Sequence, residues 1–197
     1  MSKTVEQSLY KEKTMKKPEY IYIPYPPINN KTFSEMSKRE ALSFFSWFIE
    51  NLDARIHNMC EYLQFQGGFD PETLHVLWRA IIGKYGSVPQ NELSSAISCA
   101  GLYLAETLRH QYPHLTWECR LKGPKYGDKN MPVLTGFYEY SYHPPFPMYF
   151  EPENMIRVQA SRLYDHTADE GQLYRLFELW SKHARDVKSL PKTQGDG

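Results

Sequence analysis

The chain has 197 residues, a length that suits one domain. Its 23 basic residues balance 23 acidic ones, which argues against nucleic-acid binding, because proteins with that function carry a basic face. The sequence contains no apolar run of the ~18 residues that a membrane span needs, and no apolar segment of a signal peptide near its start. We therefore predict a cytoplasmic protein without membrane contact.

The two ends are predicted to lie outside the folded domain. Residues 1–17 carry five lysines against two glutamates, a composition typical of a disordered basic tail. Residues 188–197 are predicted to form a flexible tail. The remaining residues, 18–187, are predicted to form a single α+β domain. It opens with an extended aromatic arm, Tyr20–Ile28, whose prolines exclude a helix.

The first of three N-terminal helices is predicted to begin at a capping box formed by Ser37 and Glu40. Phe44 and Trp47 are predicted to point away from the main apolar stripe of this helix and to pack beneath the aromatic arm, with a partner surface as the alternative. Apolar residues at steps of three and four predict one continuous buried stripe on this helix: Leu42, Phe45, Ile49, Leu52, Ile56, Met59 and Leu63.

Two further helices are predicted before residue 111. Asp70 and Pro71 begin the second, since an acidic cap followed by proline is typical of a helix start. The third runs from about Asn91 to His110 and is apolar on both sides. A helix with this pattern is usually central in the fold.

Three strands and a last helix are predicted in the second half of the chain. The strands are Thr116–Leu121, Pro132–Tyr140 and Asn154–Ala160, and the helix spans about Asp169 to Asp186. The predicted buried residues of this helix are Leu173, Leu176, Phe177, Trp180 and Ala184. The order predicts an α+β fold with three N-terminal helices, a small antiparallel β-meander and a C-terminal helix, packed as one pair of layers.

Glu106 is the residue with the strongest chemical signal, because it lies on the apolar third helix. A buried carboxylate must be paired or protonated. Arg109 and His110 follow three and four residues later and are its predicted partners. A structural ion pair is one interpretation, and the general acid or base of a small hydrolase or ligand-binding enzyme is the alternative.

Other chemistry has no motif in the sequence. Neither His-Glu-x-x-His nor Cys-x-x-Cys occurs, and neither a P-loop nor Gly-x-Gly-x-x-Gly is present. We therefore predict no metal and no cofactor. Three cysteines lie far apart within apolar patterns, which predicts free thiols: Cys60, Cys99 and Cys119.

The segment Tyr140–Phe150 contains five aromatic residues and three prolines. Prolines stiffen a loop and reduce the entropy that it loses on binding, and aromatic residues are typical interface anchors. The alternative is that these rings cover the sheet. The predicted contact residues of this loop and of the N-terminal arm are Tyr142, Phe146, Met148, Tyr149, Phe150, Tyr22 and Tyr25.

Residues 20–160 resemble a group of small, mostly uncharacterised cytoplasmic proteins of Gram-positive bacteria. The matching motifs are Tyr25-Pro-Pro, Met36–Ala41 before an aromatic helix, Gly101-x-Tyr-Leu-x-Glu106, Leu115-x-Trp-Glu118 and Asn130-x-Pro-Val-Leu-x-Gly-Phe137. The resemblance implies an immunity or antitoxin protein, with a toxin as its partner, or an accessory factor of a mobile element. We thus predict a non-enzymatic module that binds a protein, with its oligomeric state left open.

Overall fold

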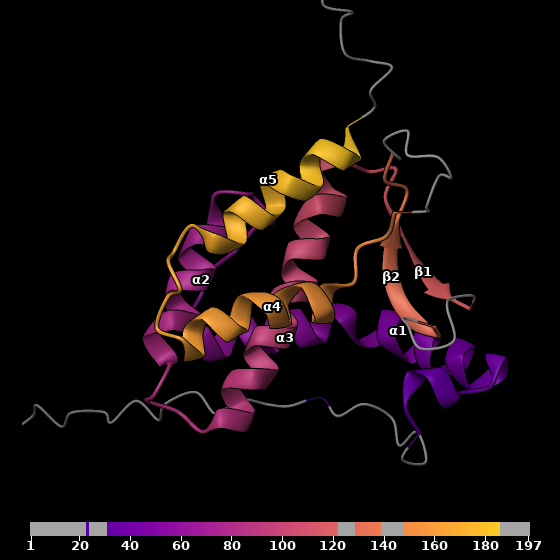
Figure 1. Ribbon diagram of the computed structural model, residues 1–197, viewed down its shortest axis with the longest axis horizontal. Helices are drawn as coiled ribbons and strands as arrows, with labels where there is room; N and C mark the ends of the chain where they lie inside the picture. The colour runs from indigo at the N-terminus through magenta and orange to yellow at the C-terminus, as the bar shows by residue number, and fades with distance from the viewer. Residues whose placement is uncertain (1–22, 24–30, 122–128, 139–147, 186–197) are drawn as a thin grey trace, which may run out of the picture.

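The computed structural model describes residues 23, 31–121, 129–138 and 148–185. Within these residues the chain forms an α+β fold that is mostly helical (Figure 1), which confirms the predicted class. A short 3-10 helix, η1, spans Phe33–Glu35. The α-helices are α1 (Lys38–Leu63), α2 (Thr73–Lys84), α3 (Gln90–Gln111), α4 (Pro152–Tyr164) and α5 (Gln172–Ala184), and the strands are β1 (Thr116–Arg120) and β2 (Met131–Thr135).

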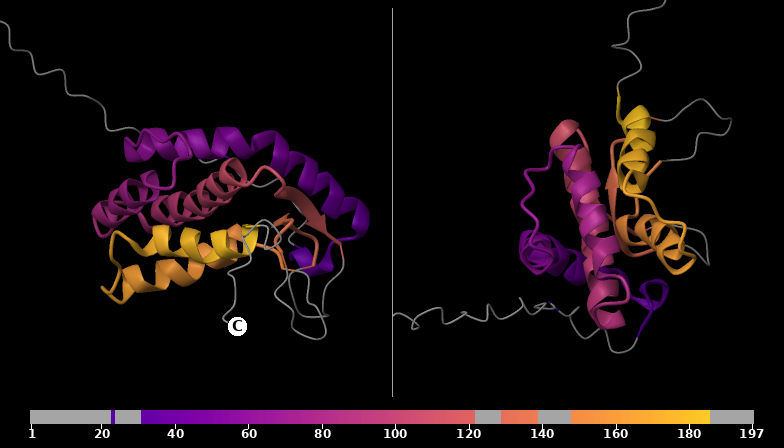
Figure 2. Two further views of the ribbon diagram at one scale, coloured as in Figure 1. Left: turned by 90° about the horizontal axis from the view of Figure 1, so that it is seen from above. Right: turned by 90° about the vertical axis from the view of Figure 1, so that its left-hand side faces the viewer.

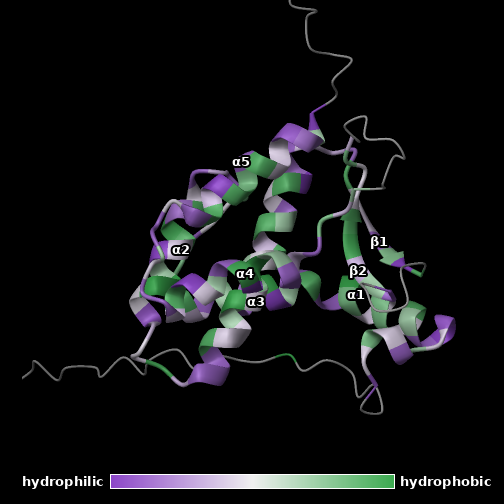
Figure 3. Ribbon diagram, viewed as in Figure 1, coloured by the Kyte–Doolittle hydropathy of each residue, from purple (hydrophilic) through white to green (hydrophobic). Residues whose placement is uncertain are grey.

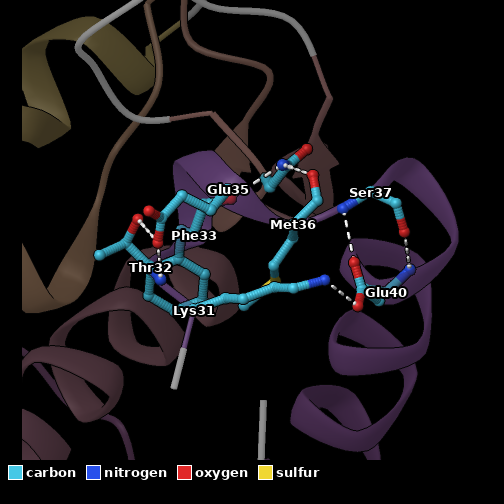
Figure 4. Close-up of polar contacts among 8 residues, drawn as sticks. Lys31, Thr32, Phe33, Glu35, Met36, Ser37 and Glu40 are labelled. Atoms are coloured by element: carbon cyan, nitrogen blue, oxygen red, sulfur yellow. Dashed lines mark hydrogen bonds and ion pairs between the residues drawn. The ribbon is translucent and has the colours of Figure 1, made fainter. Parts of the chain in front are cut away.

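Two successive capping boxes precede α1 (Figure 4). Thr32 and Glu35 bracket η1, and Ser37 and Glu40 bracket the first turn of α1. The Ser37 amide donates to Glu40 Oε2 at 2.7 Å, and the Glu40 amide donates to Ser37 Oγ at 3.3 Å. The other oxygen of Glu40 accepts from Lys31 Nζ at 2.6 Å. The capping box predicted at Ser37 is confirmed, and it fixes the residue at which α1 starts.

The predicted buried stripe of α1 is wrong in its N-terminal half. Leu42 and Ile49 are 42% and 41% exposed, whereas Phe44 and Phe48 are buried in the core. This half of the helix is apolar on two sides, so spacing alone does not choose between them. Phe48 faces inward because its ring packs edge-on against Trp117, with the ring centroids 5.1 Å apart.

Helix α3 is the centre of the fold, as predicted. Every residue from Cys99 to Leu108 is buried, and α3 contacts α1, α2, α4 and α5 (Figure 2). Helix α4 comes closest at Gly101. A Cβ atom at that position would lie 2.6 Å from the carbonyl oxygen of Pro152, so only glycine allows this approach.

The predicted third strand, Asn154–Ala160, is wrong, because these residues lie in α4. The sheet of the described residues has two antiparallel strands, with Thr116 paired to Thr135, and an isolated bridge joins Leu134 to Phe150. Proline at the first helical position and an acidic first turn favour a helix start over a strand. The predicted three-stranded meander is therefore replaced by a two-stranded hairpin followed by the additional helix α4.

The turn before β2 is tied to the segment that precedes α1. Asn130 is 1% exposed and has a left-handed backbone, with φ of 68°. Its side-chain amide donates to the carbonyl oxygens of Phe33 and Met36, at 2.8 and 2.9 Å. Asparagine tolerates this backbone conformation better than most residues, so it can join the two segments.

Helix α5 packs on α2 and α3 through the apolar residues that the sequence predicted for it. Figure 3 shows hydrophobic residues along β2 and an alternation of hydrophobic and hydrophilic residues along α2 and α5, as expected where one side faces the core. Trp180 of α5 contacts the rings of Phe137 and Phe150 at 4.9 and 5.0 Å between centroids. None of the described helices is both long and apolar enough to cross a membrane.

Candidate functional site

A groove of about 860 Å³ lies between α1, α3 and the loop that follows α1. Its volume falls within the range of ligand-binding pockets, roughly 300–1,000 Å³. Charged and polar side chains form its rims, and aromatic rings form much of its floor. The lining includes Asp53, His57, Cys60 and Glu61 of α1, Phe65, Gly67 and Phe69 of the loop, and Tyr103, Glu106, Arg109 and His110 of α3.

Glu106 lies buried at the groove with two hydrogen-bonding partners. The Trp117 indole N–H donates to its Oε1 at 2.6 Å, and Arg109 Nε lies 3.1 and 3.2 Å from its two oxygens. The structure thus brings Arg109 to Glu106. His110 instead stacks on Phe69, with the ring centroids 4.6 Å apart.

The contacts of Glu106 compensate its charge inside the protein. Its side chain is 4% exposed, and that of Arg109 is 44% exposed. Hydrogen bonds to a charged group are worth about 1.5–3 kcal/mol, and a buried carboxylate without them costs more. The pair and the indole therefore make Glu106 an anchor that joins α3 to β1.

The loop after α1 holds two non-glycine residues with a left-handed backbone, Gln64 at φ of 53° and Phe69 at φ of 56°. For a bulky aromatic residue this conformation costs about 1–3 kcal/mol and persists only where the surroundings impose it. Tyr103 imposes it here, since its hydroxyl accepts from the Phe69 amide at 3.1 Å and lies 2.8 Å from Thr73 Oγ1. The Phe69 ring is thereby fixed over the groove, 4.9 Å from the Tyr103 ring.

Gly67 and Gly68 provide a matched test of this packing. A Cβ atom at Gly67 would overlap the Tyr103 hydroxyl and lie 2.5 Å from the Phe65 ring, whereas one at Gly68 would meet nothing within 4 Å. Gly67→Ala is expected to lower the free energy of unfolding by about 2 kcal/mol through overpacking. Gly68→Ala is expected to leave it unchanged or raise it by about 0.5 kcal/mol. Urea unfolding of both variants measures the difference, and equal stabilities would contradict the loop geometry.

Cys60 lies half-buried in the groove, and burial raises the pKa of its thiol to about 11. Near neutral pH the residue is therefore a thiol rather than a thiolate. Because the thiolate is the nucleophile, this position is poorly suited to nucleophilic catalysis.

A second group of charges, which the sequence reasoning missed, lies where α4 starts. Arg55 Nη2 is 3.4 Å from Glu153 Oε1, and Arg120 Nη1 is 3.7 Å from Glu151 Oε1. Arg120 also lies over the Tyr149 ring, 3.6 Å from its centroid. Arg55 is 6% exposed and lies on the buried side of α1. Arginine is rarely buried without a partner, so its place beside the apolar stripe of this helix could have indicated the ion pair from the sequence.

Burial raises the pKa of the Glu153 carboxyl to about 7, from an ordinary value of 4.5. Between pH 4.5 and about 7 the carboxyl is protonated in the folded state and ionised in the unfolded state. The free energy of unfolding is therefore highest below pH 4.5 and falls as the pH rises through about 7. We expect the free energy of unfolding of the wild type to fall by about 2 kcal/mol between pH 5 and pH 8, and we expect Glu153→Gln to abolish this fall. The value is smaller than the full pKa shift implies, because Arg55 attracts the carboxylate.

Unfolding by urea across this pH range measures the effect. Glu40→Gln is the control, because hydrogen bonds from Lys31 and from Ser37 lower the pKa of Glu40 to about 2, below the range tested. Parallel pH profiles for the wild type and Glu153→Gln would contradict the assignment.

The predicted aromatic contact residues are only partly described. Tyr142, Phe146, Tyr22 and Tyr25 lie outside the described residues, as do the predicted tails at residues 1–17 and 188–197. Met148 and Tyr149 are half-buried. Phe150 corrects the prediction, because it is 0% exposed and packs in the core against Trp180. It therefore belongs to the covering of the sheet and offers no surface to a partner.

Among the described residues, no group of three or more histidine, cysteine, aspartate or glutamate side chains is placed to hold a metal ion. In comparisons with known proteins, no family model, no curated protein and no solved structure matches the chain.

Proposed function

We propose that this chain is a non-enzymatic protein-binding module and that the groove between α1 and α3 is part of its contact surface. The carrying observation is a groove of about 860 Å³ with an aromatic floor and charged rims. Interfaces that are specific combine buried aromatic anchors with a polar rim. The strained Phe69 backbone adds support, because strain of this kind concentrates at functional sites.

The alternative is a small hydrolase or ligand-binding enzyme that uses Glu106 as acid or base. Both oxygens of Glu106 already accept hydrogen bonds, from Trp117 and Arg109, and the nearby Cys60 is held as a thiol. These contacts favour a structural role for Glu106 and support binding as the better proposal. The narrower proposal, an immunity protein whose partner is a toxin, rests on the sequence resemblance alone.

A bulky substitution on the rim tests the proposal without disturbing the core. The His57 side chain is 69% exposed and lines the groove, so His57→Trp is expected to obstruct the groove while the chain stays folded. Val76→Trp is the matched control, because Val76 is 51% exposed on α2 and lies outside the groove.

Affinity capture from native lysate is then compared across the wild type and the two variants. A near-stoichiometric protein retained by the wild type and by Val76→Trp, but lost by His57→Trp, is the expected result. Capture that is equal for all three forms would show that the groove is not a contact surface.

A further inference from the structure

More acidic than basic side chains line the groove, and this excess of negative charge indicates what kind of partner group the groove can bind. Three carboxylates line it, from Asp53, Glu61 and Glu106, against the single guanidinium of Arg109. With the histidines counted as uncharged, two negative charges remain. A partner group that enters such a groove is favoured by a positive charge.

The two remaining carboxylates both lie on the α1 rim. Glu106 and Arg109 form an ion pair and neutralise each other, which leaves Asp53 and Glu61. These two residues are eight positions apart on one helix, so they share a face about 12 Å apart along its axis, and His57 lies between them. Glu61 is 62% exposed, and its Oε1 lies 3.3 Å from His57 Nε2. The Asp53 side chain makes no hydrogen bond or ion pair with a described residue.

Aromatic rings line the same groove. Phe69 is half-buried, and its ring packs on both Tyr103 and His110. A cation gains about 0.5–2 kcal/mol over an aromatic face, and the guanidinium of an arginine can stack on a ring while it pairs with a carboxylate. A groove that combines carboxylates with aromatic rings therefore matches a guanidinium better than it matches an anionic or purely apolar group.

Arg109 makes the α3 rim of the groove less favourable for a cation than the α1 rim. Glu106 engages its Nε, and its two terminal nitrogens make no hydrogen bond to a described residue. A second cation is repelled at this α3 rim and attracted at the α1 rim. The position of a bound cation is thus defined on the side of Asp53 and Glu61.

We propose that this groove receives an arginine side chain from a basic segment of the protein partner. The guanidinium lies on the α1 rim between Asp53 and Glu61, where both carboxylates attract it. This inference rests on the proposed function and names the chemistry that its contact surface recognises.

Three capped peptides test the inference on the full chain: Gly-Arg-Gly-Arg-Gly, the same peptide with citrulline, and the same peptide with glutamate. Citrulline keeps the shape of arginine without its charge. Titration followed by amide NMR shifts is expected to show the arginine peptide binding about tenfold more tightly than the citrulline peptide. The shifts are expected at residues 53–69 and 103–110, and the glutamate peptide is expected to give none.

Two double variants of equal net charge complete the test. Asp53→Asn with Glu61→Gln is expected to weaken binding of the arginine peptide about tenfold. Asp165→Asn with Glu178→Gln removes two exposed acids away from the groove, and it is expected to change the affinity by less than about twofold.

The inference is overturned by three results: no binding of the arginine peptide, equal binding of the citrulline peptide, or equal weakening by the two double variants. Its failure is distinguishable from failure of the proposed function. If His57→Trp abolishes partner capture while Asp53→Asn with Glu61→Gln retains it, the groove binds a protein through some group other than arginine. If His57→Trp retains the partner, the groove itself is excluded as the contact surface.

Discussion

Gly101→Ala is expected to lower the free energy of unfolding by about 3 kcal/mol, at the upper end of the cost of overpacking. The added methyl group would lie 2.6 Å from the carbonyl oxygen of Pro152 and 3.1 Å from the Ile156 side chain. A backbone atom cannot swing aside as a side chain can, so α4 must move away from α3. Chemical unfolding of the purified variant measures the loss.

Gly83→Ala is the control for this substitution. Gly83 lies near the end of α2, and a Cβ atom there would meet nothing within 4 Å. Alanine is favoured over glycine within helices, so this variant is expected to gain about 0.5 kcal/mol. If both variants match the wild type in stability, α3 and α4 lie farther apart than the structure places them.

Glu106→Ala is expected to cost about 3 kcal/mol, because it leaves the Trp117 indole N–H without its acceptor and opens a space beside α3. Trp117→Phe is expected to cost about 2 kcal/mol by removing one of the two donors that hold the carboxylate. Both values follow from the loss of a hydrogen bond to a buried charge.

A double-mutant cycle separates this interaction from general damage. The two substitutions remove the same hydrogen bond, so the double variant is expected to cost at least about 1 kcal/mol less than the two single losses together. Losses that simply add would mean that Trp117 and Glu106 do not stabilise each other. Leu42→Ala, at an exposed position of α1, is expected to change stability by less than about 0.5 kcal/mol.

Signals carried by neighbouring residues predicted their part of the fold correctly. The capping box at Ser37, the central helix around Cys99–Leu108 and the buried residues of α5 each depend on spacing within one segment. The error at α1 has a different origin. Its first half is apolar on two sides, and contacts with distant rings, such as that of Phe48 with Trp117, decide which side is buried.

Helix α4 was predicted as a strand, although its sequence contains features of a helix. Pro152 and Glu153 mark a helix start, and Ile156, Ala160 and Leu163 recur at helical spacing. The run from Asn154 to Ala160 is short enough to suit a strand as well. Burial against Gly101 of α3 selects the helix, and that contact joins residues about fifty positions apart.

In the candidate site, too, features within one helix were predictable from the sequence, and features that depend on distant contacts were not. The spacing of Glu106 and Arg109 on one helix was sufficient to predict their ion pair. The groove requires α1 and the loop after it to lie against α3, and no local pattern contains that arrangement. The left-handed backbone of Phe69 is also hidden from the sequence, because the Tyr103 hydroxyl that holds it is 34 positions away.

The side-chain amide of Asn130 has a consequence for the order in which the molecule assembles. It joins the hairpin turn to carbonyl groups 97 and 94 positions earlier in the chain. Bringing such distant segments together costs chain entropy, and a two-stranded hairpin has little stability of its own. The hairpin turn and the start of α1 therefore lock together late in folding, once α1 and α3 have packed. In the reverse direction this junction is among the first to open, so exchange of its amide hydrogens with solvent should outpace exchange within α3.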